Sequence, residues 1–326
     1  MQIILDTVLP VFGVVLVGYF ATRAHWFDDA AIKGLSLFAF SFAIPMMLFR
    51  SMARTELPDA VPWGFLLSYY SSAFSIWALA MLAGGALFKR KLDGMVMVGL
   101  CACFGNSVMI GVPLVLTTFG EVASVPMFLI IAFRAAVFLS VGTLLLELAR
   151  GSRDGLRRLP GNILHGMATN PIIVGLALGF SVALSGFSLP GPVDRIANLI
   201  AVAAAPASLF AMGATLTQYR VAGNLPESSL LVVLKLVAQP LLYWVYSHYV
   251  FEVDPFYAKV GLLMAALPVG ANPYLFAQRY GVGVASTTTT IFLSTGASVL
   301  TLSVVLLLVS DGIGATIPLP PLPALR

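Results

Sequence analysis

Charged residues are scarce in this sequence. Only 10% of its 326 residues are Asp, Glu, Lys or Arg, whereas 59% are hydrophobic and the mean hydropathy is +0.96. A soluble domain needs roughly a quarter of its residues charged to cover its surface. The shortage of charge therefore excludes an ordinary soluble protein and indicates a chain that has lipid as its solvent.

Cysteine and histidine are also rare. The two cysteines, Cys101 and Cys103, lie two residues apart in one apolar segment, so neither a disulfide nor a metal site is predicted. The three histidines, His25, His165 and His248, are far apart in the sequence. We find no phosphate-binding loop and no nucleophile–base pair. The sequence predicts no enzyme and no bound cofactor.

Acidic residues are missing from the middle of the apolar segments. Asp6, Glu121 and Glu147 all lie near segment ends. Proton pumps usually hold a titratable group at mid-membrane, so coupling through a protein carboxylate is not expected. A proton carried on the substrate and a sodium ion held by Asn, Ser, Thr and backbone oxygens both remain open.

The apolar segments themselves predict an all-α membrane protein. They are continuous and do not alternate, which excludes a transmembrane β-barrel. Most are long enough to cross the ~30 Å hydrocarbon core as helices. The ten predicted spans are residues 3–22, 34–53, 64–88, 95–119, 122–148, 166–186, 196–218, 228–250, 257–280 and 286–309.

Basic residues predict the orientation of these spans. With the N-terminus outside, eleven Lys and Arg residues fall in inward loops and five on the outward side. Such a bias is typical of cytoplasmic loops, so both termini are predicted to be periplasmic. The basic residues are scattered over separate loops and predict no nucleic-acid partner. The longest charged connection divides the chain into a first five-helix repeat (1–148), a cytoplasmic loop (149–165) and a second repeat (166–326).

An internal repeat supports this division. Three matches share almost the same offset: Pro10 and Gly18 with Pro171 and Gly179, and Pro45 with Pro206, at 161 residues, and Val98-Gly99-Leu100 with Val260-Gly261-Leu262 at 162 residues. A repeat of five helices is odd, so the second copy enters the membrane from the opposite side. Inverted repeats of this kind are typical of transporters with a substrate site at the repeat interface. Chance similarity between apolar helices is the alternative.

Two predicted spans are interrupted at corresponding positions. The fourth contains the run from Asn106 to Pro113 with Ser107 and Gly111, and the ninth contains Pro268, Gly270, Asn272 and Pro273. Proline removes a backbone donor and opens a helix, and open backbone is tolerated at membrane depth only in a protein interior or a watery cavity. The new helix N-termini attract anions. The breaks therefore predict a binding site, although ordinary helix kinks would look similar.

Two basic residues lie inside predicted spans. An arginine at the centre of a helix is expensive in lipid, so Arg134 is predicted to face the protein interior. It either attracts an anionic substrate or makes a structural bond to backbone carbonyls or a carboxylate. Lys235 lies eight residues into the eighth span, where it either has a structural role or extends to an interface.

At the interrupted spans the chain resembles the auxin efflux carrier family, which joins the plant PIN carriers to bacterial permeases. The stretch Asn106-Ser107-x-x-x-Gly111-x-Pro113 is similar to the fourth-helix motif of the family. The stretch Ala266-Leu267-Pro268-x-Gly270-x-x-Pro273-x-x-Phe276-Ala277-x-x-Tyr280 closely resembles its ninth-helix motif. Unlike the plant carriers, this chain has a short central loop and no acidic residue in its third span, which argues against auxin as the ligand.

The resemblance implies an architecture like that of bile acid/sodium symporters and the antiporter NhaA. Spans 1, 2, 6 and 7 would form a scaffold, and spans 3–5 and 8–10 a transport domain that moves like an elevator in the bacterial inner membrane. A small organic anion of the malonate or malate type would bind where spans 4 and 9 cross, and the protein would be a homodimer. The implied binding residues are Asn106, Ser107, Asn272, Gly270, Arg134 and Met47, with Pro45 and Pro206 in the scaffold-side wall. An auxin-like monocarboxylate exporter and a carboxylate sensor that does not transport are the alternatives.

Overall fold

The computed structural model describes residues 7–55, 61–150, 161, 164–187, 189–219 and 221–310. In this part of the chain the secondary structure is helical, apart from one isolated pair of bridging residues. Six helical segments are long and apolar enough to cross a membrane, and four further apolar helices are shorter. The predicted connecting loop, 149–165, falls largely outside the described residues.

The first half contains the helices α1 to α7. Their bounds are α1 Leu9–Arg23, α2 Asp29–Phe38, η2 Ala39–Ala43, α3 Ile44–Ala53, α4 Trp63–Phe88, α5 Leu92–Cys103, η3 Ser107–Gly111, α6 Val112–Phe119, η4 Glu121–Ala123 and α7 Ser124–Arg150. The segments α2, η2 and α3 follow one another without a gap, as a single 25-residue candidate span.

The second half contains α9 to α16. Their bounds are α9 Pro171–Ser185, α10 Gly191–Val202, α11 Ala204–Leu216, α12 Leu225–Val233, η5 Leu234–Ala238, α13 Gln239–Val245, η6 Tyr246–Val250, α14 Pro255–Ala265, α15 Asn272–Tyr280 and α16 Val284–Ser310. Two helical segments begin earlier than the approximate spans predicted from 34 and 196: they begin at Asp29 and Gly191. Their polar first turns belong to the helix, because Asp28 caps the one and a proline opens the other.

Local sequence explains where several helices begin. Asn170, Asn224 and Asp254 each precede a helix. Asn170 and Asn224 accept a hydrogen bond from one of its first backbone amides, and Asp254 accepts two. Each of these helices has a proline in its first turn, where a missing N–H group costs nothing. Side-chain caps and prolines therefore end the connections and start the helices at fixed residues.

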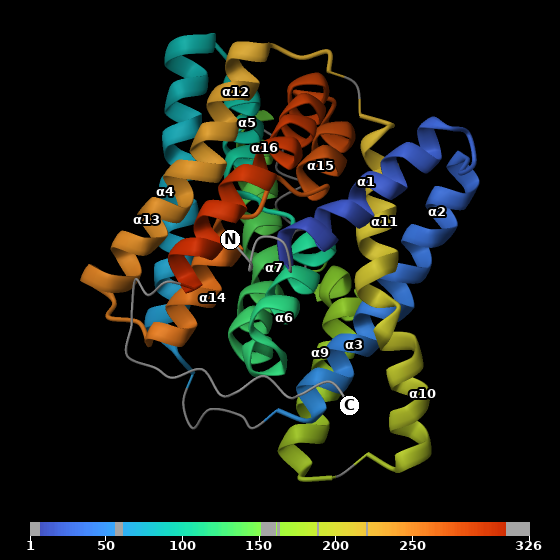
Figure 1. Ribbon diagram of the computed structural model, residues 1–326. Coiled ribbons are helices and arrows are strands. Elements are labelled where there is room, and N and C mark those ends of the chain that lie inside the picture. Colours follow the sequence, from blue (N-terminus) through green and yellow to red (C-terminus); the bar gives the residue numbers. More distant parts are fainter. Residues whose placement is uncertain are drawn as a thin grey trace.

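The helices form two groups that lie side by side (Figure 1). In one group, α1 packs along α11 and α3 packs along α9. Glycines allow both pairs to approach closely: a Cβ atom on Gly18 would overlap the carbonyl of Phe210, and one on Gly179 would overlap the carbonyl of Phe49. Because Gly179 and Phe210 follow Gly18 and Phe49 by 161 residues, the two contacts are equivalent with the halves exchanged. In the other group, α4 packs on α5, and α12 packs on α16.

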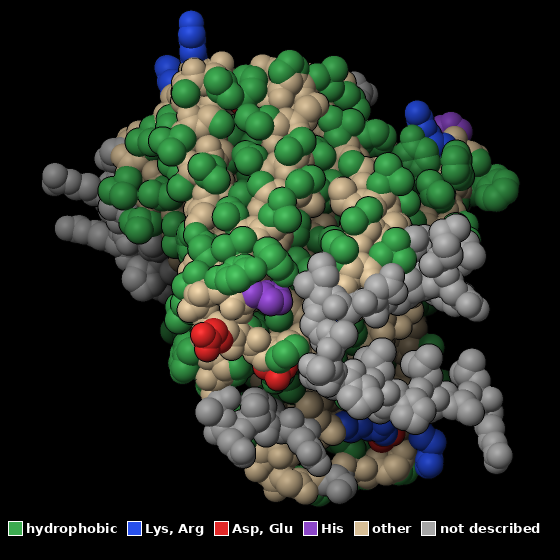
Figure 2. Space-filling model, turned by 60° about the vertical axis from the view of Figure 1, so that its left-hand side comes forward, with side chains coloured by type: hydrophobic (Ala, Val, Ile, Leu, Met, Phe, Trp, Pro, Cys, Tyr) green, Lys and Arg blue, Asp and Glu red, His purple; other side chains and the backbone are tan. Residues whose placement is uncertain are grey.

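The outer surface is apolar over much of its height. Figure 2 shows one face covered with hydrophobic side chains, with charged side chains near its upper and lower ends. Large side chains such as Leu82, Leu199 and Leu300 are exposed on different helices. In water such a surface would drive aggregation, whereas in a membrane it contacts lipid.

Candidate functional site

The predicted break in the fourth span has a defined geometry. Helix α5 ends at Cys103, and Phe104 turns the backbone into an extended conformation. The helix resumes at Ser107, where the Asn106 Oδ1 atom accepts a hydrogen bond from the Met109 amide at 3.2 Å. Asn106 is therefore an N-cap residue, with its side chain at the positive end of the second half-helix.

The ninth span is interrupted in the same way. Helix α14 ends at Ala265, and α15 begins at Asn272. The last helical residues before the two breaks, Cys103 and Ala265, are separated by 162 residues, which is the offset of the neighbouring repeat. Pro268 and Gly270 are buried in the second link, while the Asn272 side chain is half-buried at the start of α15.

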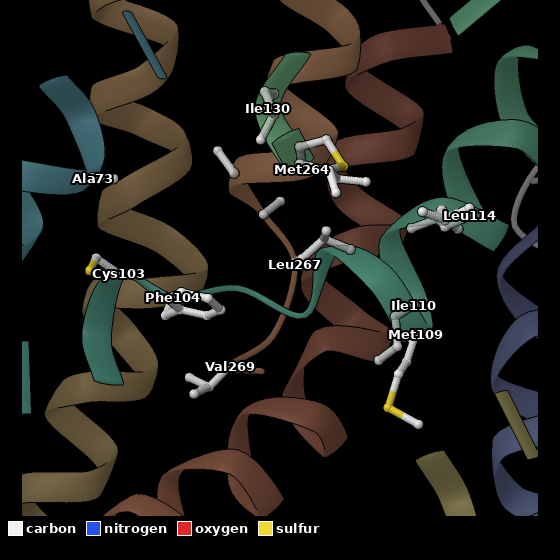
Figure 3. Close-up of a cluster of buried hydrophobic side chains, with 14 of the residues drawn as sticks. Ala73, Cys103, Phe104, Met109, Ile110, Leu114, Ile130, Met264, Leu267 and Val269 are labelled. Atoms are coloured by element: carbon white, nitrogen blue, oxygen red, sulfur yellow. The ribbon is translucent and has the colours of Figure 1, made fainter. Parts of the chain in front are cut away.

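The two links cross and bind each other through their backbones. The Asn106 amide donates a hydrogen bond to the Pro268 carbonyl at 2.6 Å, and the Gly270 amide donates one to the Phe104 carbonyl at 2.9 Å. Gly105 and Val269 thereby pair as an antiparallel bridge. Figure 3 shows the apolar side chains around this crossing. The exchange satisfies backbone groups that the breaks would leave without partners at membrane depth.

Two basic side chains bind the ends of the half-helices that lead into the crossing. Arg134 of α7 is 5% exposed and donates a hydrogen bond to the carbonyl of Gly105, two residues beyond α5. Lys235 of η5 is fully buried, and its Nζ atom donates a hydrogen bond to the carbonyl of Ala265 at 2.6 Å. The interpretation that Lys235 extends to an interface is wrong. Basic side chains are well placed near helix C-termini, because the last carbonyl groups of a helix can accept their hydrogen bonds.

The helices that begin after the two breaks are η3 and α15, and neither has an acidic residue in its first turn. The ion pairs among the described residues join Arg50, Arg54 and Arg90 to carboxylates. No ion pair among them includes Arg134 or Lys235. The N-termini of η3 and α15 bring partial positive charge to the crossing. Partial positive charge and the two basic side chains therefore lie close together at the crossing.

The crossing contacts the first group of helices through α11. The Asn106 Nδ2 atom lies 3.3 Å from the Met212 sulfur, and the Ser208 hydroxyl donates to the Met109 carbonyl at 3.3 Å. Met212 and Ser208 were not among the predicted site residues. The sequence offers only one signal for them, their proximity to Pro206 in the repeat.

The remaining predicted residues lie at different depths. Ser107, Gly111 and Pro113 are buried, and the Ser107 hydroxyl has no hydrogen-bond partner among the described residues. Met47 is half-buried against the core. The Pro45 carbonyl lies against Gly175 of α9, whereas Pro206 is exposed. The structure therefore places Asn106, Gly270 and Arg134 at the crossing and Pro45 between α3 and α9.

One buried ionic cluster was missed by the sequence analysis. The Arg90 guanidinium donates to both carboxylate oxygens of Glu227, at 2.8 and 2.5 Å, and Ser286 donates to the same carboxylate at 2.7 Å. The hydrogen bond to Glu227 raises the pKa of Arg90 above its usual value. Since these residues belong to the α4–α5 connection, α12 and α16, the cluster holds three parts of the second helix group together.

Known membrane transporters are similar in sequence to this chain over most of its length. The family model described as "Membrane transport protein" matches residues 3–306. A protein of Rhizobium meliloti (strain 1021) named "Putative malonate transporter" is 30% identical over 305 residues, which cover 94% of this chain and 95% of that protein. "Uncharacterized transporter YfdV" of Escherichia coli (strain K12) is 23% identical over 287 residues, 84% of this chain and 87% of its own. "Uncharacterized transporter MJ1031" of Methanocaldococcus jannaschii is 22% identical over 310 residues, 92% and 96% of the two chains.

Proposed function

We propose that this chain carries a small organic anion. The chain belongs to the membrane transport protein family, which is the auxin efflux carrier family that its motifs resemble. One observation carries the choice of an anion: two half-helix N-termini meet at a crossing that lacks carboxylates among the described residues. Amide donors, the Asn106 side chain, the Arg134 cation and the Lys235 donor all favour a negatively charged ligand.

A malonate-type dicarboxylate is the substrate class we propose. Two breaks supply two sets of donors, and a short dicarboxylate has one carboxylate for each. The name of the Rhizobium meliloti relative supports the same class. Asn106 and Asn272 would bind the carboxylates together with Ser107 and Gly270. Arg134 and Lys235, which bond to backbone carbonyls beside the crossing, would add positive charge when the anion is bound.

We also propose that the fold consists of two inverted five-helix repeats. The exchanged contacts of Gly18 with Phe210 and Gly179 with Phe49 support this symmetry, and so do the matching helix ends at Cys103 and Ala265. In this arrangement both termini are periplasmic, as the charge bias predicts.

An elevator-type movement fits the distribution of contacts. The Arg90–Glu227 pair and the bond from Lys235 to Ala265 hold the helices of the second group together. The bonds between the crossing and α11 are longer, 3.3 Å for Asn106 with Met212 and for Ser208 with Met109. A short bond between the Ser51 and Ser124 hydroxyls also joins the two groups. The helices α1–α3 and α9–α11 would form the scaffold and the others the transport domain, and a homodimer would fix the scaffold in the inner membrane.

Flux measurements in proteoliposomes test this proposal. We expect the purified chain to take up radiolabelled malonate and to produce currents on a solid-supported membrane, with monocarboxylates less effective. No flux with any mono- or dicarboxylate would contradict the transport function. Thermal stabilisation by a carboxylate without flux would indicate a sensor, and preferred transport of aromatic monocarboxylates would indicate an auxin-like exporter.

A further inference from the structure

Lys235 occupies an unusual position for a lysine. Its side chain is fully buried, and its Nζ atom makes one hydrogen bond, to the Ala265 carbonyl at 2.6 Å. A Cβ atom built on Gly105 would lie 3.3 Å from Nζ. The amine therefore lies directly against the link that carries Asn106, on the side facing α14.

Lys235 has no acidic side chain as a partner among the residues that the structure describes. The nearby titratable or charged groups are Arg134 of α7, which donates to the carbonyl of the same Gly105, and Cys103 of α5, two residues before Gly105. No ion pair in the described part of the chain includes it. A lysine ammonium has three donors, and the structure gives Lys235 one acceptor.

Such surroundings favour the neutral amine over the ammonium. A buried cation without a counter-ion loses its hydration without an equivalent gain, and a second cation close by adds repulsion. Lysine releases its proton readily under these conditions, whereas arginine keeps its charge. Of the two basic groups at the crossing, Lys235 is therefore the one whose charge can change.

We propose that Lys235 couples anion binding to the uptake of one proton, an inference that rests on the proposed anion transport. In the empty site Nζ is a neutral amine that still donates to Ala265. When the anion binds at Asn106, its field favours the ammonium, and a proton from solution adds to the lone pair of Nζ. The proton and the anion are then carried together, and both leave on the other side. In this mechanism Lys235 binds and releases the coupled proton, a role that an acidic residue has in many proton-coupled carriers.

Linkage fixes the sign of the pH dependence. If the anion increases the proton affinity of Lys235, the proton increases the anion affinity by the same factor. Anion binding should therefore weaken as the pH rises, by about tenfold per pH unit where the empty lysine is neutral and the occupied one is protonated.

Calorimetric titration of the full-length protein with malonate tests the proposal. The measurements use two buffers of different ionisation enthalpy, between about pH 7 and pH 9, where carboxylic acids are ionised and the ligand adds no proton of its own. For the unchanged chain we expect uptake of close to one proton per malonate. Lys235→Arg should bind malonate with no proton uptake and an affinity that does not change with pH. Lys235→Met should lose both the proton uptake and most of the affinity.

Lys259→Met is the matched control. Lys259 lies on α14, the helix that ends at Ala265, but more than one helical turn before that end. This variant should keep the proton uptake and the pH dependence of the unchanged chain. Malonate binding without proton uptake, or an unchanged pH dependence in Lys235→Arg, would overturn the coupling and leave anion transport intact. If the unchanged chain binds no carboxylate, both proposals fail.

Discussion

Arg134 donates a hydrogen bond to the carbonyl of Gly105, the residue that pairs with Val269 at the crossing. Its guanidinium carbon also lies 4.2 Å from the centroid of the Phe104 ring. A buried arginine with a cation–π contact and a carbonyl partner is held in one orientation. These contacts support the structural role of Arg134, which is one of the two roles that the sequence left open. Its charge still adds to the potential at the anion site.

Arg134→Gln should mainly destabilise the protein. The substitution removes a charge-assisted hydrogen bond to a buried carbonyl, which costs about 1.5–3 kcal/mol. We expect a lower melting temperature in detergent and a higher apparent KM for malonate in the remaining folded protein. Arg134→Lys keeps the charge and separates the two effects. A normal melting temperature for Arg134→Gln would contradict the structural role.

Gly18→Ala and Gly179→Ala should destabilise the protein by similar amounts. Each added methyl group meets a backbone carbonyl, of Phe210 or of Phe49, that cannot move without displacing a helix. Overpacking of this kind costs about 1–3 kcal/mol. Thermal unfolding followed by size-exclusion chromatography measures the effect. Gly13→Ala is the matched control on α1, because a Cβ atom there meets nothing within 4 Å. A large loss in only one of the two variants would argue against equivalent contacts in the two halves.

The Arg90–Glu227 pair should respond asymmetrically to substitution. Glu227 is fully buried, whereas the Arg90 side chain is 34% exposed. Arg90→Met leaves a buried carboxylate with Ser286 as its remaining partner and should cost about 3 kcal/mol, near the low end of the range for a broken buried pair. Glu227→Met should cost less, because the freed guanidinium can reach water.

The double variant Arg90→Met/Glu227→Met, together with the two single variants and the unchanged chain, forms a double-mutant cycle. With both residues replaced by Met, no buried charge is left unpaired, so we expect a stability above that of Arg90→Met alone. Additive losses, measured by thermal unfolding of the four proteins, would mean that the two side chains do not interact energetically.

A disulfide between α3 and α7 should stop transport without preventing binding. The hydroxyls of Ser51 and Ser124 lie 2.5 Å apart and connect the proposed scaffold to the proposed transport domain. Cysteines at these positions are close enough to form a disulfide. Cys101 and Cys103 are buried and should not compete. We expect oxidised Ser51→Cys/Ser124→Cys to lose malonate flux and to regain it on reduction. Full flux in the oxidised double variant, with each single variant as control, would contradict relative movement at this contact.

Much of the fold follows from patterns that are local in sequence. The positions of the breaks at Asn106 and Pro268 were predicted because proline, glycine and asparagine interrupt otherwise apolar helices for reasons that need no tertiary structure. The six long helices follow from hydropathy and length in the same way. The equivalence of Gly18 and Gly179 also appeared in the sequence, as a repeated spacing.

The contacts of the site were harder to predict because they join distant segments. Nothing near Met212 in the sequence shows that its sulfur meets Asn106, 106 residues earlier. Glu227 lies just before a predicted span and resembles a solvated helix-end charge, until folding brings Arg90 to it from 137 residues away. The burial of Lys235 depends on the surrounding helices, since a lysine near a span end has the length to reach water.

Asn106→Asp should abolish malonate binding while the protein remains folded. The aspartate keeps an oxygen to cap the Met109 amide, so the half-helix retains its N-cap. It loses the amide donor and adds a negative charge where we propose that a carboxylate binds. Asn106→Ala and Asn272→Ala should weaken binding less severely, because they remove a donor without adding repulsion.

Binding of malonate, measured by calorimetry beside thermal unfolding, separates these effects from loss of structure. Asn198→Asp is a suitable control, since Asn198 is half-buried on α10 and lies outside the crossing. It should change neither the affinity nor the response to pH. If Asn106→Ala and Asn272→Ala both keep full affinity, the crossing is not the binding site. The two positive helix ends then serve only to join the halves of the protein.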